Sequence, residues 1–92
     1  MSNIDWESLV TKAMSDAALA AEQAAIQVAT EEQWQRAEME SIAGQLLALE
    51  DGDPIALPGN DRAWRDYRIQ VRAWKEGAAG YPDQTLRPVR PI

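Results

Sequence analysis

Neither cysteine nor histidine occurs among the 92 residues, and phenylalanine is absent as well. Without cysteine the chain forms no disulfide and no thiolate metal site. Without histidine it lacks a common zinc ligand and the usual general base at neutral pH. A chain of this length buries only about 60–65% of the surface that its unfolded form exposes, so its core must be thin. Contacts with a partner are therefore the expected supplement to its stability.

Signals for catalysis and for membrane insertion are also scarce. The five glycines are scattered singly, which excludes a glycine-rich phosphate loop, and a Ser-His-Asp triad needs histidine. Paired acids such as Asp51 and Asp53 have neither the pocket of an acid–base pair nor the ligand spacing of a calcium loop. No apolar run approaches the roughly 18 residues that span a bilayer, and the first residues lack the features of a signal peptide. We expect a soluble, non-enzymatic protein without metal, cofactor or membrane contact, kept inside the cell.

Charge is divided unevenly along the chain. Residues 1–50 carry nine acidic and two basic side chains, whereas residues 51–92 carry seven basic and six acidic ones. We therefore distinguish an acidic segment, 1–50, from a near-neutral segment, 51–92, within a single domain.

Helix-forming residues dominate the acidic segment. Between Asp5 and Leu49 there is no proline, Gly44 is the only glycine, and alanine, glutamate, glutamine and leucine prevail. Apolar residues at helical spacing form two seams, Val10, Ala13, Ala17, Ala20 and Ala24 in the first and Met39, Ile42, Leu46 and Leu49 in the second. The phase slips between the seams, where Thr30 and Gln33 have the spacing of a capping box. The pattern predicts one helix of about 45 residues or two helices that meet near residues 29–30.

The first seam consists mostly of alanine, which buries little area per residue, so an isolated chain gains little by folding it. Small side chains also let two helix backbones approach closely. Two arrangements remain open. The seam lies against a partner or another copy in an oligomer, or it packs on residues 51–92 in a self-contained hairpin.

Two turn clusters, residues 51–54 and 58–61, flank the apolar residues Ile55 and Leu57. We expect an ordered linker here, because these two side chains would pin the connection to a core. A flexible tether would be rich in serine and glycine instead.

A second helix is predicted to begin at Asn60 or Asp61 and to end near Glu76, with Gly77 as the residue after its C-terminus. It carries an aromatic stripe, Trp64, Tyr67, Val71 and Trp74, beside a basic stripe, Arg65, Arg68, Arg72 and Lys75. Aromatic residues at helical spacing are common in cores, while tryptophan, tyrosine and arginine are also enriched at interface hot spots. The aromatic stripe therefore predicts either core packing or a partner-binding face.

Basic side chains interleaved with rings also suit nucleic acid, since arginine neutralises phosphate while a ring stacks on a base. Against this, the net charge is −6, and the acidic segment is the nearest partner for the arginines of the basic stripe. We expect no nucleic-acid partner.

Three prolines follow Gly80, at positions 82, 88 and 91, and they exclude a helix and favour an extended tail. The sequence thus predicts an all-α fold: a long alanine-rich N-terminal helix or helical hairpin, an ordered linker, a second short helix and an extended proline-rich C-terminal tail.

The order of motifs in residues 45–92 is distinctive. Gln45-Leu46-Leu47 leads to Asp53-Pro54, then to Trp64-Arg65-Asp66-Tyr67-Arg68 and Val71-Arg72-Ala73-Trp74, and finally to Tyr81-Pro82-Asp83 and Arg87-Pro88-Val89-Arg90-Pro91. This half of the chain resembles the tail-assembly chaperones of tailed bacteriophages. In that family a helix with a Trp-x-x-Tyr-Arg pattern precedes an aromatic-proline turn and a proline-ended tail.

The resemblance implies a helper that binds a phage tail or tail-fibre protein in the host-cell cytoplasm during assembly, as part of a homo-oligomer or hetero-oligomer. Such a helper would cover apolar surface or strand edges of a slow-folding, β-rich client. The predicted partner contacts are Trp64, Tyr67, Arg68, Val71, Trp74, Tyr81, Pro82, Pro88 and Pro91. If the aromatic stripe is core, the binding surface is the alanine-rich helix and the tail. The alternatives are a permanent structural subunit of a phage tail, fibre or baseplate, located in the virion tail, and a nucleic-acid-associated regulator.

Overall fold

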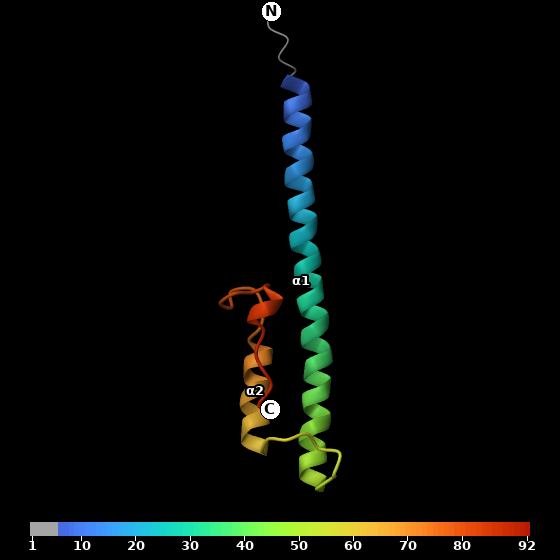
Figure 1. The fold of residues 1–92 in the computed structure, drawn as a ribbon, viewed down its shortest axis with the longest axis vertical. Helices are drawn as coiled ribbons and strands as arrows, with labels where there is room; N and C mark the ends of the chain where they lie inside the picture. The colour runs from blue at the N-terminus through green and yellow to red at the C-terminus, as the bar shows by residue number, and fades with distance from the viewer. Residues whose placement is uncertain (1–5) are drawn as a thin grey trace, which may run out of the picture.

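The computed structural model describes the backbone of residues 6–92 and the side chains of residues 11–92. The chain forms one long helix, α1 (Trp6–Asp51), a shorter helix, α2 (Asp61–Arg72), and one turn of 3-10 helix, η1 (Gln84–Leu86). The all-α class is thus confirmed, since residues 6–92 contain no strand. Figure 1 shows α2 and the tail beside one half of α1, while the other half projects away from them. The molecule is correspondingly elongated, with extents of 81 × 19 × 17 Å.

The acidic segment forms a single continuous helix. α1 has 46 residues and is therefore about 69 Å long. At the predicted break, the Thr30 hydroxyl donates a hydrogen bond to the Ile26 carbonyl at 2.8 Å. Of the two alternatives, the single helix is therefore correct, because this bond ties Thr30 back to the preceding turn of a helix that continues. The phase slip instead marks where tertiary packing begins, since residues 11–27 are all exposed.

The linker is held by a polar contact with α1. The Gln45 side chain binds Leu57 through both of its amide atoms: Nε2 donates to the carbonyl and Oε1 accepts from the backbone N–H, each at 2.8 Å. Ile55 is 78% exposed and Leu57 is 40% exposed. The prediction that these two side chains pin the linker is therefore wrong. One buried glutamine does so, because it satisfies a donor and an acceptor of the same residue.

The start of α2 follows the sequence signals. Asn60 caps the helix, accepting a hydrogen bond from the Ala63 N–H at 2.8 Å. Just before it, Gly59 has φ +109°, and a Cβ there would lie 2.8 Å from Nε1 of Trp64. That indole nitrogen donates to the Pro58 carbonyl at 3.0 Å. The close approach of backbone and ring explains why glycine stands at position 59.

The end of α2 comes earlier than predicted. The helix ends at Arg72, so Gly77 is not the residue after its C-terminus. The Gln35 side chain of α1 donates to the carbonyls of Val71, Arg72 and Trp74 at 2.7, 3.2 and 3.0 Å. Carbonyls at and just beyond the end of α2 thus gain a donor from another helix, which stabilises an end of α2 before the glycine.

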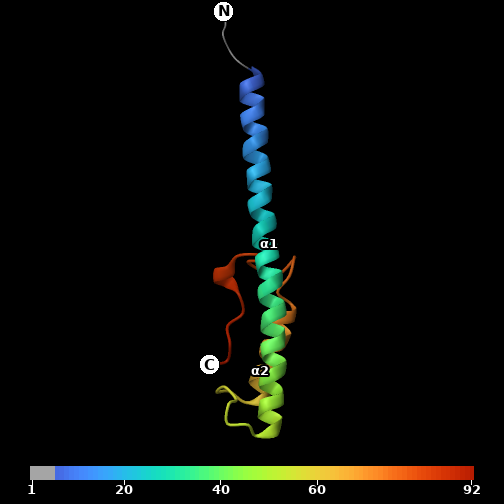
Figure 2. The ribbon, with the colours of Figure 1, turned by 90° about the vertical axis from the view of Figure 1, so that its right-hand side faces the viewer.

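The core lies between α2 and the second half of α1. Its buried members are Ile42, Trp64, Tyr67 and Val71, against which Trp34, Met39, Leu46 and Leu49 pack. The second seam of α1 therefore faces the core. The described members of the first seam, Ala13, Ala17, Ala20 and Ala24, are exposed, so they do not pack on residues 51–92 as the hairpin alternative requires. Figure 2 shows that the tail runs along a different side of α1 from α2.

Candidate protein-interaction surfaces

The aromatic stripe of α2 faces α1. Trp64, Tyr67, Val71 and Trp74 are 1%, 3%, 0% and 4% exposed. The core alternative is therefore correct for these four residues, and they form no exposed partner-binding face in this structure. Their helical spacing correctly predicts that they share one face, but spacing alone does not say whether the surface that covers this face belongs to the same chain.

Three polar side chains on α1, which we call the polar ladder, face the aromatic stripe. Glu31, Glu38 and Gln45 are buried and stand seven residues apart, which places them on one face at intervals of two turns. The Tyr67 hydroxyl donates to Glu38 at 2.9 Å, and the Trp74 indole N–H donates to Glu31 at 3.0 Å. The two donors are also seven residues apart, Tyr67 within α2 and Trp74 two residues beyond its end, so their spacing matches that of Glu38 and Glu31.

The same two carboxylates hold the C-terminal tail. Arg87 donates to Glu31 through Nε and Nη2, each at 2.6 Å. Arg90 donates to Glu38 through Nε at 2.5 Å and Nη2 at 3.1 Å. Both pairs have the two-pronged geometry that makes arginine–carboxylate contacts strong and specific. They join residues more than 50 positions apart and fix the tail along α1 (Figure 2).

Two tryptophans flank these pairs. The guanidinium carbon of Arg87 lies 4.9 Å from the ring centroid of Trp34, and that of Arg90 lies 6.0 Å from the ring centroid of Trp64. A cation over an indole face is attracted by the ring quadrupole, and the attraction grows where water is excluded. Each tail arginine therefore meets a carboxylate and a ring together.

The arginine contacts also change the acidity of the two carboxyls. The Arg87 hydrogen bond, helped by the Trp74 indole, lowers the pKa of Glu31, although burial opposes the shift. The Arg90 hydrogen bond, helped by the Tyr67 hydroxyl, lowers the pKa of Glu38 against the same opposing effect. Both carboxyls are therefore held as anions, and the tail contacts depend on that charge.

We expect the free energy of unfolding to fall as the pH drops below about 5. A carboxyl whose folded pKa lies below its unfolded value, about 4.3 for glutamate, adds stability above that value and loses it as pH falls through the folded pKa. Urea midpoints measured between about pH 6 and pH 3 test this. The slope should flatten in the double variant Glu31→Gln/Glu38→Gln. Equal slopes in both proteins would show that these carboxyls do not couple tail docking to pH.

The remaining predicted contact residues lie in the Tyr81–Pro82 turn and in the tail. Tyr81, Pro82, Pro88 and Pro91 are half-buried. The Tyr81 ring packs edge-on against Trp74, with centroids 5.2 Å apart. Hollows of about 580 and 670 Å³ flank the Tyr81–Pro82 turn, between it and residues 26–36 of α1. Tyr81 and Pro82 thus lie between α2 and the tail, and all four residues keep part of their surface exposed.

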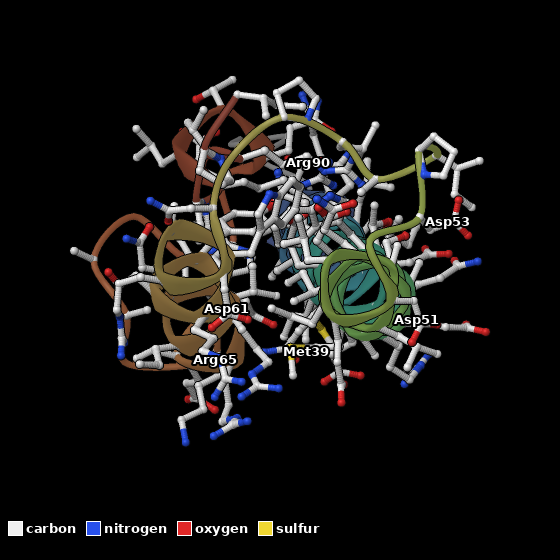
Figure 3. The ribbon with its side chains drawn as sticks, turned by 90° about the horizontal axis from the view of Figure 1, so that it is seen from below. Met39, Asp51, Asp53, Asp61, Arg65 and Arg90 are labelled. Atoms are coloured by element: carbon white, nitrogen blue, oxygen red, sulfur yellow. The ribbon has the colours of Figure 1, made fainter. Side chains whose placement is uncertain are left out.

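The basic stripe faces away from the tail. Arg65 pairs with Asp61 at 2.7 Å on the surface, so its partner belongs to α2 and not to the acidic segment. Arg68 is half-buried, and its Nε atom is enclosed without a hydrogen-bond partner among the described residues. Figure 3 shows Arg65 on the opposite side of the helix pair from Arg90. Among the described side chains, no ion pair joins the basic stripe to the acidic segment, and arginines of the tail make those pairs instead.

Among residues 11–92, the longest uninterrupted run of exposed side chains is residues 11–27 of α1, which we call the projecting arm. None of its side chains is even half-buried, and Met14, Leu19 and Ile26 are each more than half exposed. Leu19 and Ile26 are seven residues apart and share a face. The arm is about 25 Å of helix at 1.5 Å per residue, and only its last two residues border the hollow beside the Tyr81–Pro82 turn.

Sequence reasoning missed the polar ladder and its arginine partners. The available signal was the recurrence of Glu31, Glu38 and Gln45 at seven-residue intervals beside an apolar seam, which is unusual for a solvated helix face. The three-residue spacing of Arg87 and Arg90 in a proline-rich segment was the matching signal. Neither pattern identifies its partner by itself.

In the part of the chain that the structure describes, no helix has the length and apolar character needed to cross a membrane. No group of three or more acidic side chains within that part could hold a metal ion. Comparisons with protein-family models, with curated proteins and with solved structures find no match for this chain.

Proposed function

We propose that this chain is a non-enzymatic assembly helper for a phage or prophage tail, and that its projecting arm contacts the tail or tail-fibre protein. The observation that carries the proposal is the exposure of every arm side chain from residue 11 to residue 27. The resemblance of residues 45–92 to tail-assembly chaperones supports the choice of client.

An unsupported helix of this kind has a physical reason to bind. Helices in water gain most of their stability from packing an apolar face, and alanine-rich propensity alone gives marginal stability. A partner that covers Leu19 and Ile26 would supply the missing packing. The small residues around them would let the partner's backbone come close.

The surface area agrees with this argument. A compact protein of 10.2 kDa is expected to expose about 5,300 Å², whereas this chain exposes 6994 Å². The excess is well over 1,000 Å², the scale of surface that specific interfaces bury. Binding along the arm would bring the exposed area to an ordinary value.

The rest of the molecule, α2, the linker and the tail with the second half of α1, we call the body, and it has a different role. Within it, the core and the two arginine–glutamate pairs anchor the second half of α1. A rigid anchored half gives the arm a fixed direction. The aromatic stripe therefore contributes to binding indirectly, by holding the helix that carries the contact surface.

Co-expression with a phage tail or tail-fibre protein, followed by co-purification, tests the proposal. We expect Leu19→Glu/Ile26→Glu to reduce the affinity for the client at least tenfold, because two apolar contacts worth more than about 1.4 kcal/mol together are lost. Ile69→Glu is the matched control, since Ile69 is exposed to a similar degree on α2. Equal loss with the control, or no loss with the arm variant, would contradict the arm assignment.

The fate of the protein separates an assembly helper from a permanent tail subunit. Mass spectrometry of purified virions gives the stoichiometry directly. Absence from mature particles is the expected result. Presence in stoichiometric amounts would favour the structural subunit, with the arm as a permanent contact.

A further inference from the structure

We propose that the groove holding the tail is a binding site for an extended segment with two arginines three residues apart, and that it accepts the tail of a second copy of this chain. The groove is formed by Glu31, Trp34 and Glu38 of α1 with Trp64 of α2, and we call it the arginine groove. The tail is residues 87–92. In the structure the tail of the same chain fills the groove, and it thereby shows the chemistry of the ligand.

The spacing of the two carboxylates in the groove matches the distance between two guanidinium groups of the tail. Seven residues of helix separate Glu31 from Glu38, which is about 10.5 Å along the axis. Three residues of polyproline-like chain separate Arg87 from Arg90, which is about 9 Å. Arg87 has φ −56° and ψ 149°, close to that conformation, and the following proline favours it. An extended segment with two arginines at any other spacing would leave one buried carboxylate without its cation.

Side chains carry the recognition. Among the backbone hydrogen bonds outside the helices of the described chain, none involves residues 87–92. The hydrogen bonds from the tail to α1 are those of its two arginines. Because no strand pairing or helix joins tail and body, leaving the groove breaks only these contacts and the packing around them. The tail is therefore exchangeable.

A second copy is the occupant that the chain itself specifies. It carries the complementary pair of arginines, and each copy has one tail and one groove, so reciprocal exchange gives a closed dimer with a two-fold axis. The exposed area of 6994 Å² leaves surface for such a dimer to bury. The segment between α2 and the tail contains Gly77 and Gly80, both at positive φ, where the chain reverses toward α1. Glycine at these points lets the segment redirect the tail at little steric cost.

The protein concentration decides whether the groove holds the tail of the same chain or the tail of a second copy. A short linker gives the tail of the same chain an effective concentration on the order of millimolar. Wild-type protein should therefore be monomeric at micromolar concentration and should exchange tails as its concentration nears that range. Where the tail of the same chain no longer competes for the groove, the tail of a second copy should bind at a much lower protein concentration.

Two full-length variants provide the test. Arg87→Ala/Arg90→Ala has an intact groove without a working tail, and Glu31→Gln/Glu38→Gln has an intact tail without a working groove. Mixed at roughly 100 µM each, tenfold below the effective concentration, they should form a 1:1 complex in sedimentation velocity, while each alone stays monomeric. A mixture that stays monomeric, with near-UV circular dichroism showing both variants folded, would overturn the proposal.

A second measurement covers the case in which a variant unfolds. A labelled peptide of residues 84–92 is titrated into the wild-type chain up to several times the millimolar effective concentration. Saturable binding is expected, and a peptide with both arginines replaced by glutamine should not bind. No binding of the arginine peptide would refute the groove as an exchangeable site. The result is independent of client binding by the arm, because the two proposals involve different residues.

Discussion

Trp64→Ala should abolish the stable packing of α2 on α1. The ring is 1% exposed, packs edge-on against Tyr67 with centroids 5.8 Å apart, and donates its N–H to the Pro58 carbonyl. Truncating a buried tryptophan costs about 3–5 kcal/mol through lost burial and a cavity. Small domains have about 5–15 kcal/mol in total, and this thin core should lie near the lower end.

Urea unfolding followed by near-UV circular dichroism measures this effect, because the tryptophan rings of the body give that signal. Ile69→Ala is the control, since Ile69 lies on the same helix but is 56% exposed. Its midpoint should change little, as expected for a surface position. Similar midpoints for the two variants would show that Trp64 is not the centre of the core.

Arg87→Ala is the second large expected effect. It removes the cation that faces Glu31, whose side chain is 1% exposed. Breaking a buried ion pair by removing one partner costs about 3–5 kcal/mol, mostly because a buried charge is left without compensation. We expect a lower urea midpoint and a rise in the pKa of the Glu31 carboxyl.

Two further variants identify the cause. Arg65→Ala breaks an exposed pair with Asp61 and should cost only about 0.2–1 kcal/mol. Adding Glu31→Gln to Arg87→Ala removes the uncompensated charge and should recover part of the loss. No recovery in the double variant would mean that Arg87 stabilises the body through packing on Trp34 instead of through charge.

The buried pairs also fix how the three segments are aligned. Shifting α2 or the tail by one helical turn would leave Glu31 or Glu38 without its donors, which is costly in a dry environment. Buried ion pairs often add little net stability compared with apolar residues. Their value here is that the observed alignment of α1, the aromatic stripe and the tail gives both carboxylates their donors.

Short-range patterns were predictable from the sequence, and long-range pairing was not. The spacing of Met39 and Ile42, the stripe beginning at Trp64 and the cap at Asn60 all depend on neighbours within a turn or two, so the sequence predicts them correctly. By contrast, Arg87 meets Glu31 across more than 50 residues. Many acids and bases have suitable chemistry, and only the fold selects the pair.

The helix break that Thr30 allowed and the helix end predicted at Gly77 are both absent for the same reason. Thr30 has capping chemistry, yet its hydroxyl finds an acceptor inside the helix at Ile26. Gly77 suits a helix end, yet Gln35 of another helix satisfies the last carbonyls of α2 several residues earlier. In both cases a polar side chain had two possible roles, and the surroundings decided between them.

The continuity of α1 has a consequence for how the protein opens. One uninterrupted helix belongs to two cooperative units: the half beyond Glu31 unfolds with the core, whereas the arm can unfold locally without disturbing it. Amide hydrogen exchange would show a boundary within this single helix, with slow protons on one side and fast protons on the other. Ellipticity at 222 nm, which sums both halves, would therefore report a broader transition than the tryptophan signal of the body.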